Sequence, residues 1–259
     1  MMTEIPFELD TNDSRSWLIM GIELLHELGK PKEALRCFEK SLELDPDNLI
    51  TFEYMAYALK YFEKNREALG YYEKILSINP SDSKIWNKKG VLLALYMGNG
   101  KDAIESLKKA IELNPKNDWY YYYLVMVLSD SEKYDEALDF ANKCLQFSPD
   151  FEPVLYCKIH ILANMCKYNE VLELCNSLSN TKYSSGIEFS KANALANLKR
   201  FKEAVIWYDK NFQDQNHFGG IKNKKRALDA IKTGKVSSIP FTNCTKGGKF
   251  YFASIGERK

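Results

Sequence analysis

Along most of the chain, apolar residues return at spacings of three and four, which places them on one face of an α-helix. The apolar runs are short, and polar stretches such as Gly29-Lys30-Pro31 and Gly98-Asn99-Gly100 separate them. Glycine and proline in these positions end helices and form turns. The pattern therefore predicts an all-α chain of short amphipathic helices joined by tight turns.

The helical pattern repeats with a period of about 34 residues. Four similar stretches (LELDP, LSINP, IELNP, LQFSP) each end in a proline, at intervals of 34, 35 and 34: Pro46, Pro80, Pro115 and Pro149. Alanines of a second shared pattern follow the same intervals: Ala34, Ala68, Ala103 and Ala137. Two helices per period would cross closely at this alanine, where a larger side chain would hold the backbones apart. A fixed period of this length indicates a repeat architecture.

The third period, with Trp86-Asn-Lys-Lys-Gly90 followed by Ala103 and Pro115, resembles the tetratricopeptide repeat, a helix-turn-helix unit of 34 residues. Val171 and Ala204 extend the alanine series more weakly into a fifth and a sixth unit. We expect six units: Ser14–Asp47, Asn48–Ser81, Asp82–Lys116, Asn117–Asp150, Phe151–Tyr183 and Ser184–Asn216. The resemblance implies a right-handed α-α superhelix (a solenoid), with the first helix of each unit lining a concave face that holds partner segments.

The net charge of +1 hides a split between two parts of the chain. Residues 217–259 carry ten cations and two acids, so they are strongly basic, whereas residues 1–216 are acidic. We therefore expect an N-terminal extension (1–13), a solenoid of six repeats (14–216) and a basic C-terminal segment (217–259). A capping helix over about 219–233 would turn Ile221, Leu228 and Ile231 toward the open end of the solenoid, followed by a tail with a short strand near 249–252.

Aromatic residues are abundant, with 16 Tyr, 14 Phe and 4 Trp. The resemblance implies groove positions on the first helices, which include Leu18, Ile22 and Leu25 in the first unit, Tyr156, His160 and Ala163 in the fifth, and Phe189, Asn193 and Ala196 in the sixth. Because Tyr and Trp offer large area, few rotatable bonds and a polar tip, they suit recognition. We expect these partner-contacting residues: Tyr54, Tyr57, Lys84, Lys88, Trp119, Tyr122, Tyr123, Met126, Tyr156 and Phe189.

The run Trp119 to Tyr123 has a second interpretation. Four consecutive tyrosines cover all sides of a helix turn, so one or two of them face the core whatever the function. Packing and partner binding therefore both remain open for Tyr122 and Tyr123.

One known mode of partner binding does not fit. Repeats of this family that grip the carboxylates of chaperone tails use two Lys, two Asn and one Arg over three consecutive units, through charge-assisted hydrogen bonds. Here Leu18 and Ile22 occupy two of those positions, and Lys88 stands where the arginine is needed. We expect a partner peptide or protein to be held mainly by apolar side chains instead.

The sequence offers little chemistry. It contains no nucleotide-binding, hydrolase or metalloprotease motif, so we expect no enzyme, no catalytic residue and no cofactor. Cys157, His160, Cys166 and Cys175 are zinc-ligand types, but small core residues and a groove histidine are the simpler interpretation. A metal or redox role for these four residues stays open.

Localisation and function follow as expectations. The chain has no long apolar run, no signal-peptide pattern and six cysteines without a C-x-x-C pair, so we expect a cytoplasmic protein with reduced thiols and no membrane partner. We expect a scaffold or adaptor that binds a partner protein or peptide in an aromatic-rich concave groove. The alternative is a nucleic-acid-associated protein that acts through residues 217–259, and self-association through a repeat end also stays open.

Overall fold

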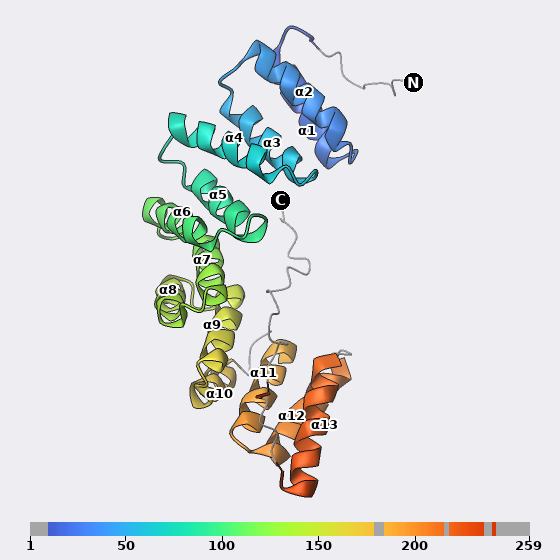
Figure 1. Cartoon of the computed structure of the whole chain (residues 1–259), viewed down its shortest axis with the longest axis vertical. Helices are drawn as coiled ribbons and strands as arrows, with labels where there is room; N and C mark the ends of the chain where they lie inside the picture. Colours follow the sequence, from blue (N-terminus) through green and yellow to red (C-terminus); the bar gives the residue numbers. More distant parts are fainter. Residues whose placement is uncertain (1–9, 179–183, 215–217, 236–239, 242–259) are drawn as a thin grey trace. The chain divides into compact units, whose positions relative to one another are not determined.

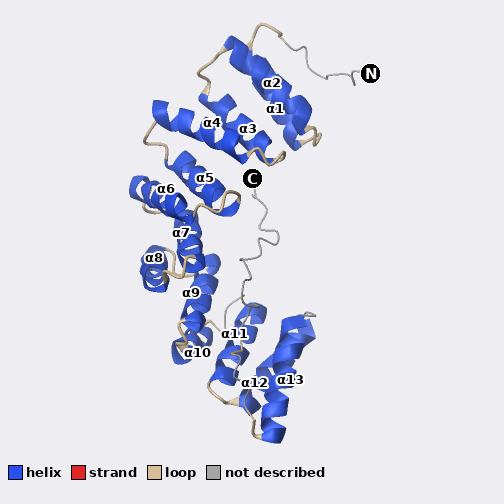
Figure 2. Cartoon of the chain, in the orientation of Figure 1, coloured by secondary structure: helices blue, strands red, loops and turns tan. Residues whose placement is uncertain are grey.

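The structure, a computed structural model, describes residues 10–178, 184–214, 218–235 and 240–241. Within these ranges every regular element is an α-helix, as Figure 2 shows. The expected all-α fold class is confirmed. The strand expected near residues 249–252 lies outside the described residues.

The helices follow one another as consecutive pairs (Figure 1). The first helices of the pairs are α1 (Ser14–His26), α3 (Leu49–Lys60), α5 (Ser83–Leu95), α7 (Asp118–Asp130), α9 (Glu152–Asn164) and α11 (Ser184–Asn197). The second helices are α2 (Pro31–Leu44), α4 (Asn65–Ile78), α6 (Gly100–Leu113), α8 (Tyr134–Phe147), α10 (Tyr168–Ser177) and α12 (Phe201–Asp214), and α13 (Phe218–Thr233) comes last. Each helix pair lies within one of the six expected repeats. The expected boundaries of the solenoid, between residues 13 and 14 and between residues 216 and 217, stay predictions.

The chain forms two compact units, which we call unit 1 (Met1–Tyr120) and unit 2 (Tyr121–Lys259). In unit 1, each helix from α1 to α6 packs on the next one along the chain. In unit 2, the same holds from α8 to α13. Because the helices contact mainly their sequence neighbours, each unit is stabilised as a stack of nearest-neighbour interfaces.

The repeated alanine sits where the two helices of a pair cross. Ala34, Ala68, Ala103, Ala137 and Ala204 are all 0% exposed, and Val171 is 1% exposed. Four residues after the first of them, Phe38 fills the space beneath Gly21 of α1, so that a Cβ on Gly21 would lie 2.4 Å from the Phe38 ring. In the third pair, a Cβ on Gly90 would lie 2.6 Å from Leu107 Cγ. The small residues are therefore required by the close approach of the two backbones.

The turn inside each pair has one residue in the left-handed region, with φ between 56° and 64°: Gly29, Glu63, Gly98, Glu132, Cys166 and Lys199. The backbone N–H of the following residue donates to the carbonyl of a leucine in the last turns of the first helix: Leu24, Leu59, Leu93, Leu128, Leu162 and Leu195. This is the hydrogen-bonding pattern that satisfies the free carbonyls at a helix end. Glycine occupies this turn position in two of the six helix pairs, at Gly29 and Gly98. The turn is therefore set by the hydrogen bond more than by the residue type.

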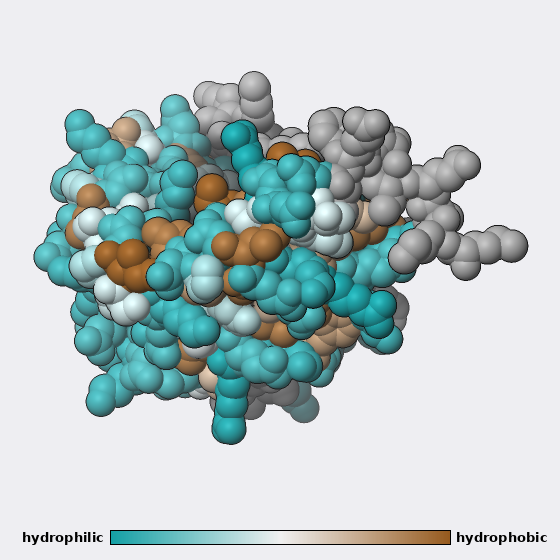
Figure 3. Space-filling view, turned by 90° about the horizontal axis from the view of Figure 1, so that it is seen from above, coloured by the Kyte–Doolittle hydropathy of each residue, from teal (hydrophilic) through white to brown (hydrophobic). Residues whose placement is uncertain are grey.

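On the face that Figure 3 shows, hydrophobic residues occur in small groups between hydrophilic ones. Among the described residues, no helix combines the length and the apolar character needed to cross a membrane.

The C-terminal helix α13 packs on α11 and α12, but two of its three expected residues are exposed. Its buried side chains are Asn223, Ala227 and Ala230, Leu228 is half-buried, and Ile221 is 53% and Ile231 is 41% exposed. The receiving surface is partly polar and partly apolar: Asn223 Nδ2 donates to Asn193 Oδ1 on α11 at 2.9 Å, and Ala227 belongs to the apolar cluster that contains Leu195 and Tyr208. The two alanines allow α13 to approach closely enough for that bond.

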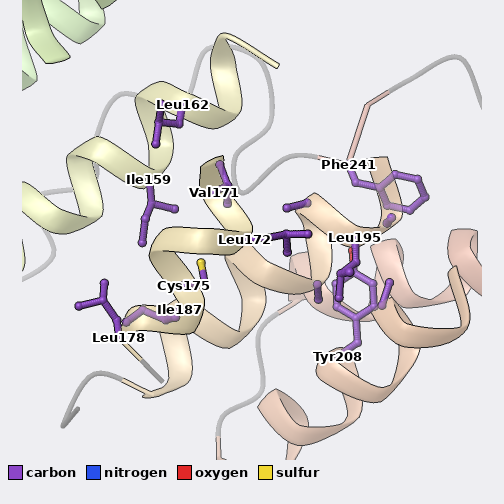
Figure 4. Packing of buried hydrophobic residues seen from close by; sticks show 14 of the residues in the cluster. Ile159, Leu162, Val171, Leu172, Cys175, Leu178, Ile187, Leu195, Tyr208 and Phe241 are labelled. Carbon is purple, nitrogen blue, oxygen red and sulfur yellow. The ribbon is translucent and has the colours of Figure 1, made fainter. Parts of the chain in front are cut away.

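The largest described core cluster of unit 2 joins α9 to α12 (Figure 4). It contains Ile159, Val171, Leu172, Cys175 and Tyr208, and Phe241 joins it from beyond α13. The cluster therefore includes a residue that lies 27 positions after the last repeat helix ends at Asp214.

Replacing Gly21 by alanine tests the close crossing in unit 1. The added methyl group would meet the fully buried ring of Phe38, which itself stacks on Tyr54 at 5.9 Å, so we expect a loss of about 1–3 kcal/mol in the free energy of unfolding. Urea denaturation followed by circular dichroism measures it. Gly70→Ala on α4 is the matched control, because no atom lies within 4 Å of its Cβ position, and should stabilise by about 0.5–1 kcal/mol. Equal stability of Gly21→Ala and the wild type would contradict the tight crossing.

Candidate functional site

Four aromatic rings from α1, α3 and the residue after α3 form a stack in unit 1, which we call the His26 cluster (His26, Tyr54, Tyr57, Tyr61). The His26 ring stacks on Tyr57 with centroids 5.4 Å apart and meets Tyr54 edge-on at 6.0 Å. Tyr57 meets Tyr61 at 5.7 Å, and their hydroxyl oxygens lie 3.4 Å apart. His26 and Tyr61 are exposed, and Tyr54 and Tyr57 are half-buried. The cluster thus presents ring edges, hydroxyl groups and an imidazole to solvent on a base of packed rings.

Cations border this cluster. The ammonium of Lys60 lies 5.0 Å from the Tyr57 ring centroid and 5.8 Å from that of Tyr96. Lys84 is exposed in the first turn of α5, whereas Lys88 forms an ion pair with Glu53 of α3 at 2.5 Å. The sequence predicts positive charge from both lysines. The charge of Lys88 is balanced by Glu53, whereas Lys84 is exposed.

Asn87, one helical position before Lys88, carries a buried polar atom. Its side-chain oxygen receives no hydrogen bond from the described residues. Such an acceptor loses stabilisation when it is buried without a donor. Asn65 and Asn117 carry buried side-chain oxygens of the same kind, so this feature recurs along the repeats.

The four consecutive tyrosines of α7 divide into two buried and two half-buried residues, because successive residues of a helix point to different sides. Tyr120 is 4% and Tyr121 is 7% exposed, while Tyr122 and Tyr123 are half-buried with ring centroids 5.3 Å apart. Trp119 is 38% exposed. The prediction that one or two of the four tyrosines face the core is therefore confirmed.

Met126, three to four residues further along α7, was expected to contact a partner, and that expectation is wrong. Its side chain is 1% exposed, like its neighbours Leu124 and Val125 at 0%. The apolar run that follows the tyrosines is buried all around, which is typical of an interior helix.

Burial raises the pKa values of Tyr122 and of the neighbouring Cys157. Burial, with the Cys157 thiol as the next contribution, raises the pKa of Tyr122 to about 12. Cys157 is 1% exposed and its own pKa is raised to about 12, again mainly by burial. Tyr122 therefore stays a neutral hydrogen-bonding group at physiological pH.

Tyr156 lines a shallow depression in unit 2. The depression is formed by Glu152, Leu155, Tyr156, Ile159, Leu178 and Ile187. Burial raises the pKa of Glu152 at its edge. The depression has no room for a water molecule, so it is not a ligand pocket. Phe189 lies apart from it and packs half-buried against Tyr208, with ring centroids 6.1 Å apart.

The four residues of zinc-ligand type do not assemble. Over the described residues no group of three His, Cys, Asp or Glu side chains lies close enough to hold a metal ion. Cys157 and Cys175 belong to the core, and burial raises the pKa of both thiols to about 12. Cys166 is exposed in the left-handed turn position, and His160 lies 3.3 Å from Asn164 through its Nδ1.

The arrangement of helix pairs and turns agrees with what known proteins show. Models of the family described as "Tetratricopeptide repeat" match residues 23–48, 83–117 and 106–139. A curated relative, "TPR repeat-containing protein MJ1428" of Methanocaldococcus jannaschii, is 32% identical over 107 residues, 41% of this chain and 18% of that protein. The chain belongs to the tetratricopeptide repeat proteins.

A second curated relative, "Protein STIP1 homolog" of Dictyostelium discoideum, is 31% identical over 85 residues, 32% of this chain and 15% of that protein. The matched part of the chain thus spans less than a fifth of the length of these two curated relatives.

Solved structures share the fold. PilF of Pseudomonas aeruginosa has a TM-score of 0.63 at 15% identity, covering 86% of this chain and 97% of that one. YrrB, whose structure is titled "a TPR protein with an unusual peptide-binding site", has a TM-score of 0.58 at 20% identity, covering 73% and 94%. At these identities the likeness shows the tetratricopeptide repeat fold alone.

Several groove positions implied by the repeat pattern belong to the core instead. Leu18 is 6% and Leu25 is 4% exposed in unit 1. Asn193 is 3% and Ala196 is 1% exposed in unit 2, whereas the positions 33 residues earlier, His160 and Ala163, are half-buried. The groove positions Asn193 and Ala196 of α11, the first helix of the sixth repeat, are therefore covered by neighbouring residues.

Three residues in and beside the His26 cluster were missed by the sequence reasoning. His26 lies one position beyond Leu25, and its i, i+4 spacing from Ile22 is the signal that would have included it. Tyr61 lies four residues after Tyr57, and the same spacing would have included it. Glu53 was not paired with Lys88, since the two are 35 residues apart.

Protonation of His160 should lower the stability of unit 2. Burial lowers the pKa of the His160 imidazole below its ordinary value of about 6.5. Between the folded and the unfolded pKa, the unfolded chain binds a proton that the folded chain does not, so the free energy of unfolding falls as pH drops through this range and levels off below it.

Urea denaturation between pH 7.5 and 5 measures the effect, and His160→Gln is expected to lose this part of the pH dependence. Identical pH profiles for the two proteins would contradict a depressed pKa.

Proposed function

We propose that this tetratricopeptide repeat protein is an interaction scaffold that binds a peptide segment of a partner protein along the first-helix face of unit 1. The observation that carries the proposal is the His26 cluster, in which stacked rings leave two exposed aromatic residues, His26 and Tyr61, on the surface. An exposed aromatic ring that already packs against other rings loses little conformational entropy when a partner binds, so it anchors the partner well.

A further feature of unit 1 supports a peptide as the ligand. The exposed Lys84 in the first turn of α5 favours a partner segment that carries a carboxylate. The balanced Lys88–Glu53 pair disfavours the multi-cation grip of a carboxylate clamp.

In unit 2, we propose that Tyr122, Tyr123 and Tyr156 contribute a second, smaller contact surface. Their rings are half-buried. YrrB, which shares the fold, is titled "a TPR protein with an unusual peptide-binding site", which agrees with a peptide as the kind of ligand. A cytoplasmic location is part of the same proposal.

Replacing Tyr57 by alanine tests the function. The change removes the ring on which His26 stacks and which Tyr61 contacts, so we expect the recovery of bound partner to fall about tenfold or more. Affinity purification from the source cells with quantitative mass spectrometry measures this. The matched control is Ile78→Ala, an apolar residue that is 52% exposed at the end of α4, a second helix. An unchanged set of partners for a folded Tyr57→Ala protein would sink the proposal.

Nucleic-acid binding through the basic C-terminal segment is the alternative function. Two of its described cations are engaged within the chain: Lys224 pairs with Asp209, and the Arg226 guanidinium lies 4.2 Å from the Phe241 ring centroid. Four others are exposed: Lys222, Lys225, Lys232 and Lys235.

We expect no complex with RNA or DNA at an ionic strength of about 0.15 M, because few cations are arranged to contact phosphates. A gel-shift titration at several salt concentrations measures it. A stable shift that disappears when Lys222, Lys225, Lys232 and Lys235 are changed to glutamate would favour the alternative function over the scaffold.

A further inference from the structure

A short segment beyond α13 is inserted into unit 2. Phe241 is 5% exposed, and its ring lies 6.2 Å from that of Phe201 at the start of α12. It joins the cluster of Figure 4 on the side where Leu195 and Tyr208 lie. Gly234, with a φ of 66°, ends α13 and lets the chain turn away from the helix. Phe241 is therefore an aromatic anchor that the chain brings back to its own repeats.

One side chain pairs with both backbone polar groups of Phe241. Asn197 Nδ2, at the end of α11, donates to the Phe241 carbonyl at 2.7 Å, and the Phe241 N–H donates to Asn197 Oδ1 at 2.9 Å. Asn197 Nδ2 also donates to the Asn193 carbonyl at 3.0 Å, which fixes the orientation of the carboxamide. The double exchange of N–H and C=O bonds is the pairing that an extended residue makes in a sheet, and it does not depend on the residue's side chain.

Arg226 of α13 contacts the same segment from the other side. Its guanidinium lies 4.2 Å from the centroid of the Phe241 ring, and its Nη1 is 3.4 Å from the Pro240 carbonyl oxygen. Together Asn197, Phe201 and Arg226, which we call the Asn197 site, contact three successive backbone groups and one aromatic ring. Pro240 itself is exposed, so its contribution is the restricted backbone that holds the segment extended.

The helices that carry the Asn197 site are held by their own polar contacts. Asn193 Oδ1 of α11 accepts from the Tyr208 hydroxyl of α12 at 2.7 Å and from Asn223 Nδ2 of α13 at 2.9 Å. All three side chains are buried, and none of these bonds involves Pro240 or Phe241. These polar contacts between α11, α12 and α13 do not require the segment.

We propose that the Asn197 site is a peptide-recognition site for an extended segment with an aromatic anchor, and that the chain's own Pro240–Phe241 occupies it in cis. The first-helix face of the sixth repeat is closed by this segment and by α13, while the corresponding Asn164 of the fifth repeat is exposed. A peptide of the same chemistry supplied in trans competes for the site. The proposal is independent of the His26 cluster and of partner binding there.

The test uses the full chain with Phe241→Ala, which removes the resident anchor, and a fluorescein-labelled peptide of residues 236–243. Fluorescence anisotropy should show saturable binding to this variant and at least about tenfold weaker binding to the wild type, because the occupied fraction of sites lowers the apparent affinity. Adding Asn197→Asp should abolish binding, since the carboxylate cannot donate to the peptide carbonyl. The matched control is Asn164→Asp, 33 residues earlier at the end of α9, which should bind like Phe241→Ala alone.

Three outcomes would overturn the proposal. One is a Phe241→Ala chain with wild-type helix content that does not bind the peptide, and another is equal binding with and without Asn197→Asp. The third is a wild-type dimer in light scattering that dissociates on Phe241→Ala, because the segment would then come from a second copy.

Hydrogen exchange covers the case in which Phe241→Ala does not fold. In an Asn197→Ala chain, the Phe241 amide should exchange at least about tenfold faster, while amides of α11 and α12 keep their protection. Equal acceleration in those two helices would mean that the segment is an inseparable part of the core, and the proposal would be wrong.

Discussion

The structure depends on the close crossing of the two helices in each repeat, which a single small residue on the second helix permits. The alanines at this position are fully buried, and in two repeats a glycine of the first helix faces the residue four positions later, Phe38 or Leu107. Burying such a side chain stabilises by several kcal/mol, with truncations of buried Phe costing about 3–5 kcal/mol, so the crossing has to stay close for the repeat to hold. Because this packing uses one side of the first helix, the opposite side is left for neighbours, solvent or a partner.

This constraint separates what the sequence could predict from what it could not. The alanine, glycine and proline positions repeat locally, so the helix pairs and their turns followed from period alone. The left-handed turn position did not, because Glu63, Glu132, Cys166 and Lys199 take a conformation usually marked by glycine. Asn193 and Met126 were assigned to the partner surface since periodicity gives a helix face but not what covers it. For the same reason Ile221 and Ile231 were expected to pack, although α13 packs through Asn223, Ala227 and Ala230.

The polar contacts of α13 explain how the last repeat is closed without an apolar cap. A solenoid end that exposed a purely apolar face would be prone to pair with another copy. Here the buried Asn193 accepts two hydrogen bonds, from Tyr208 and Asn223, so only a helix with a donor at the matching position can cover it. Buried polar groups lose stability unless they are satisfied, so this contact selects one partner and one register for α13.

The two first-helix faces that are best defined differ in what they contact. In unit 1, the His26 cluster ends in exposed rings, and the acceptor of Asn87 has no donor among the described residues. In the sixth repeat, the end of the first helix, α11, already contacts an extended backbone, because Asn197 pairs with Phe241. The chain therefore contains its own example of how a repeat face of this type holds a peptide: a carboxamide pairs with the backbone, and an aromatic ring anchors it. In the fifth repeat the corresponding Asn164 is exposed and its side-chain nitrogen lies 3.3 Å from His160 Nδ1, so the backbone pairing that Asn197 makes is not repeated there.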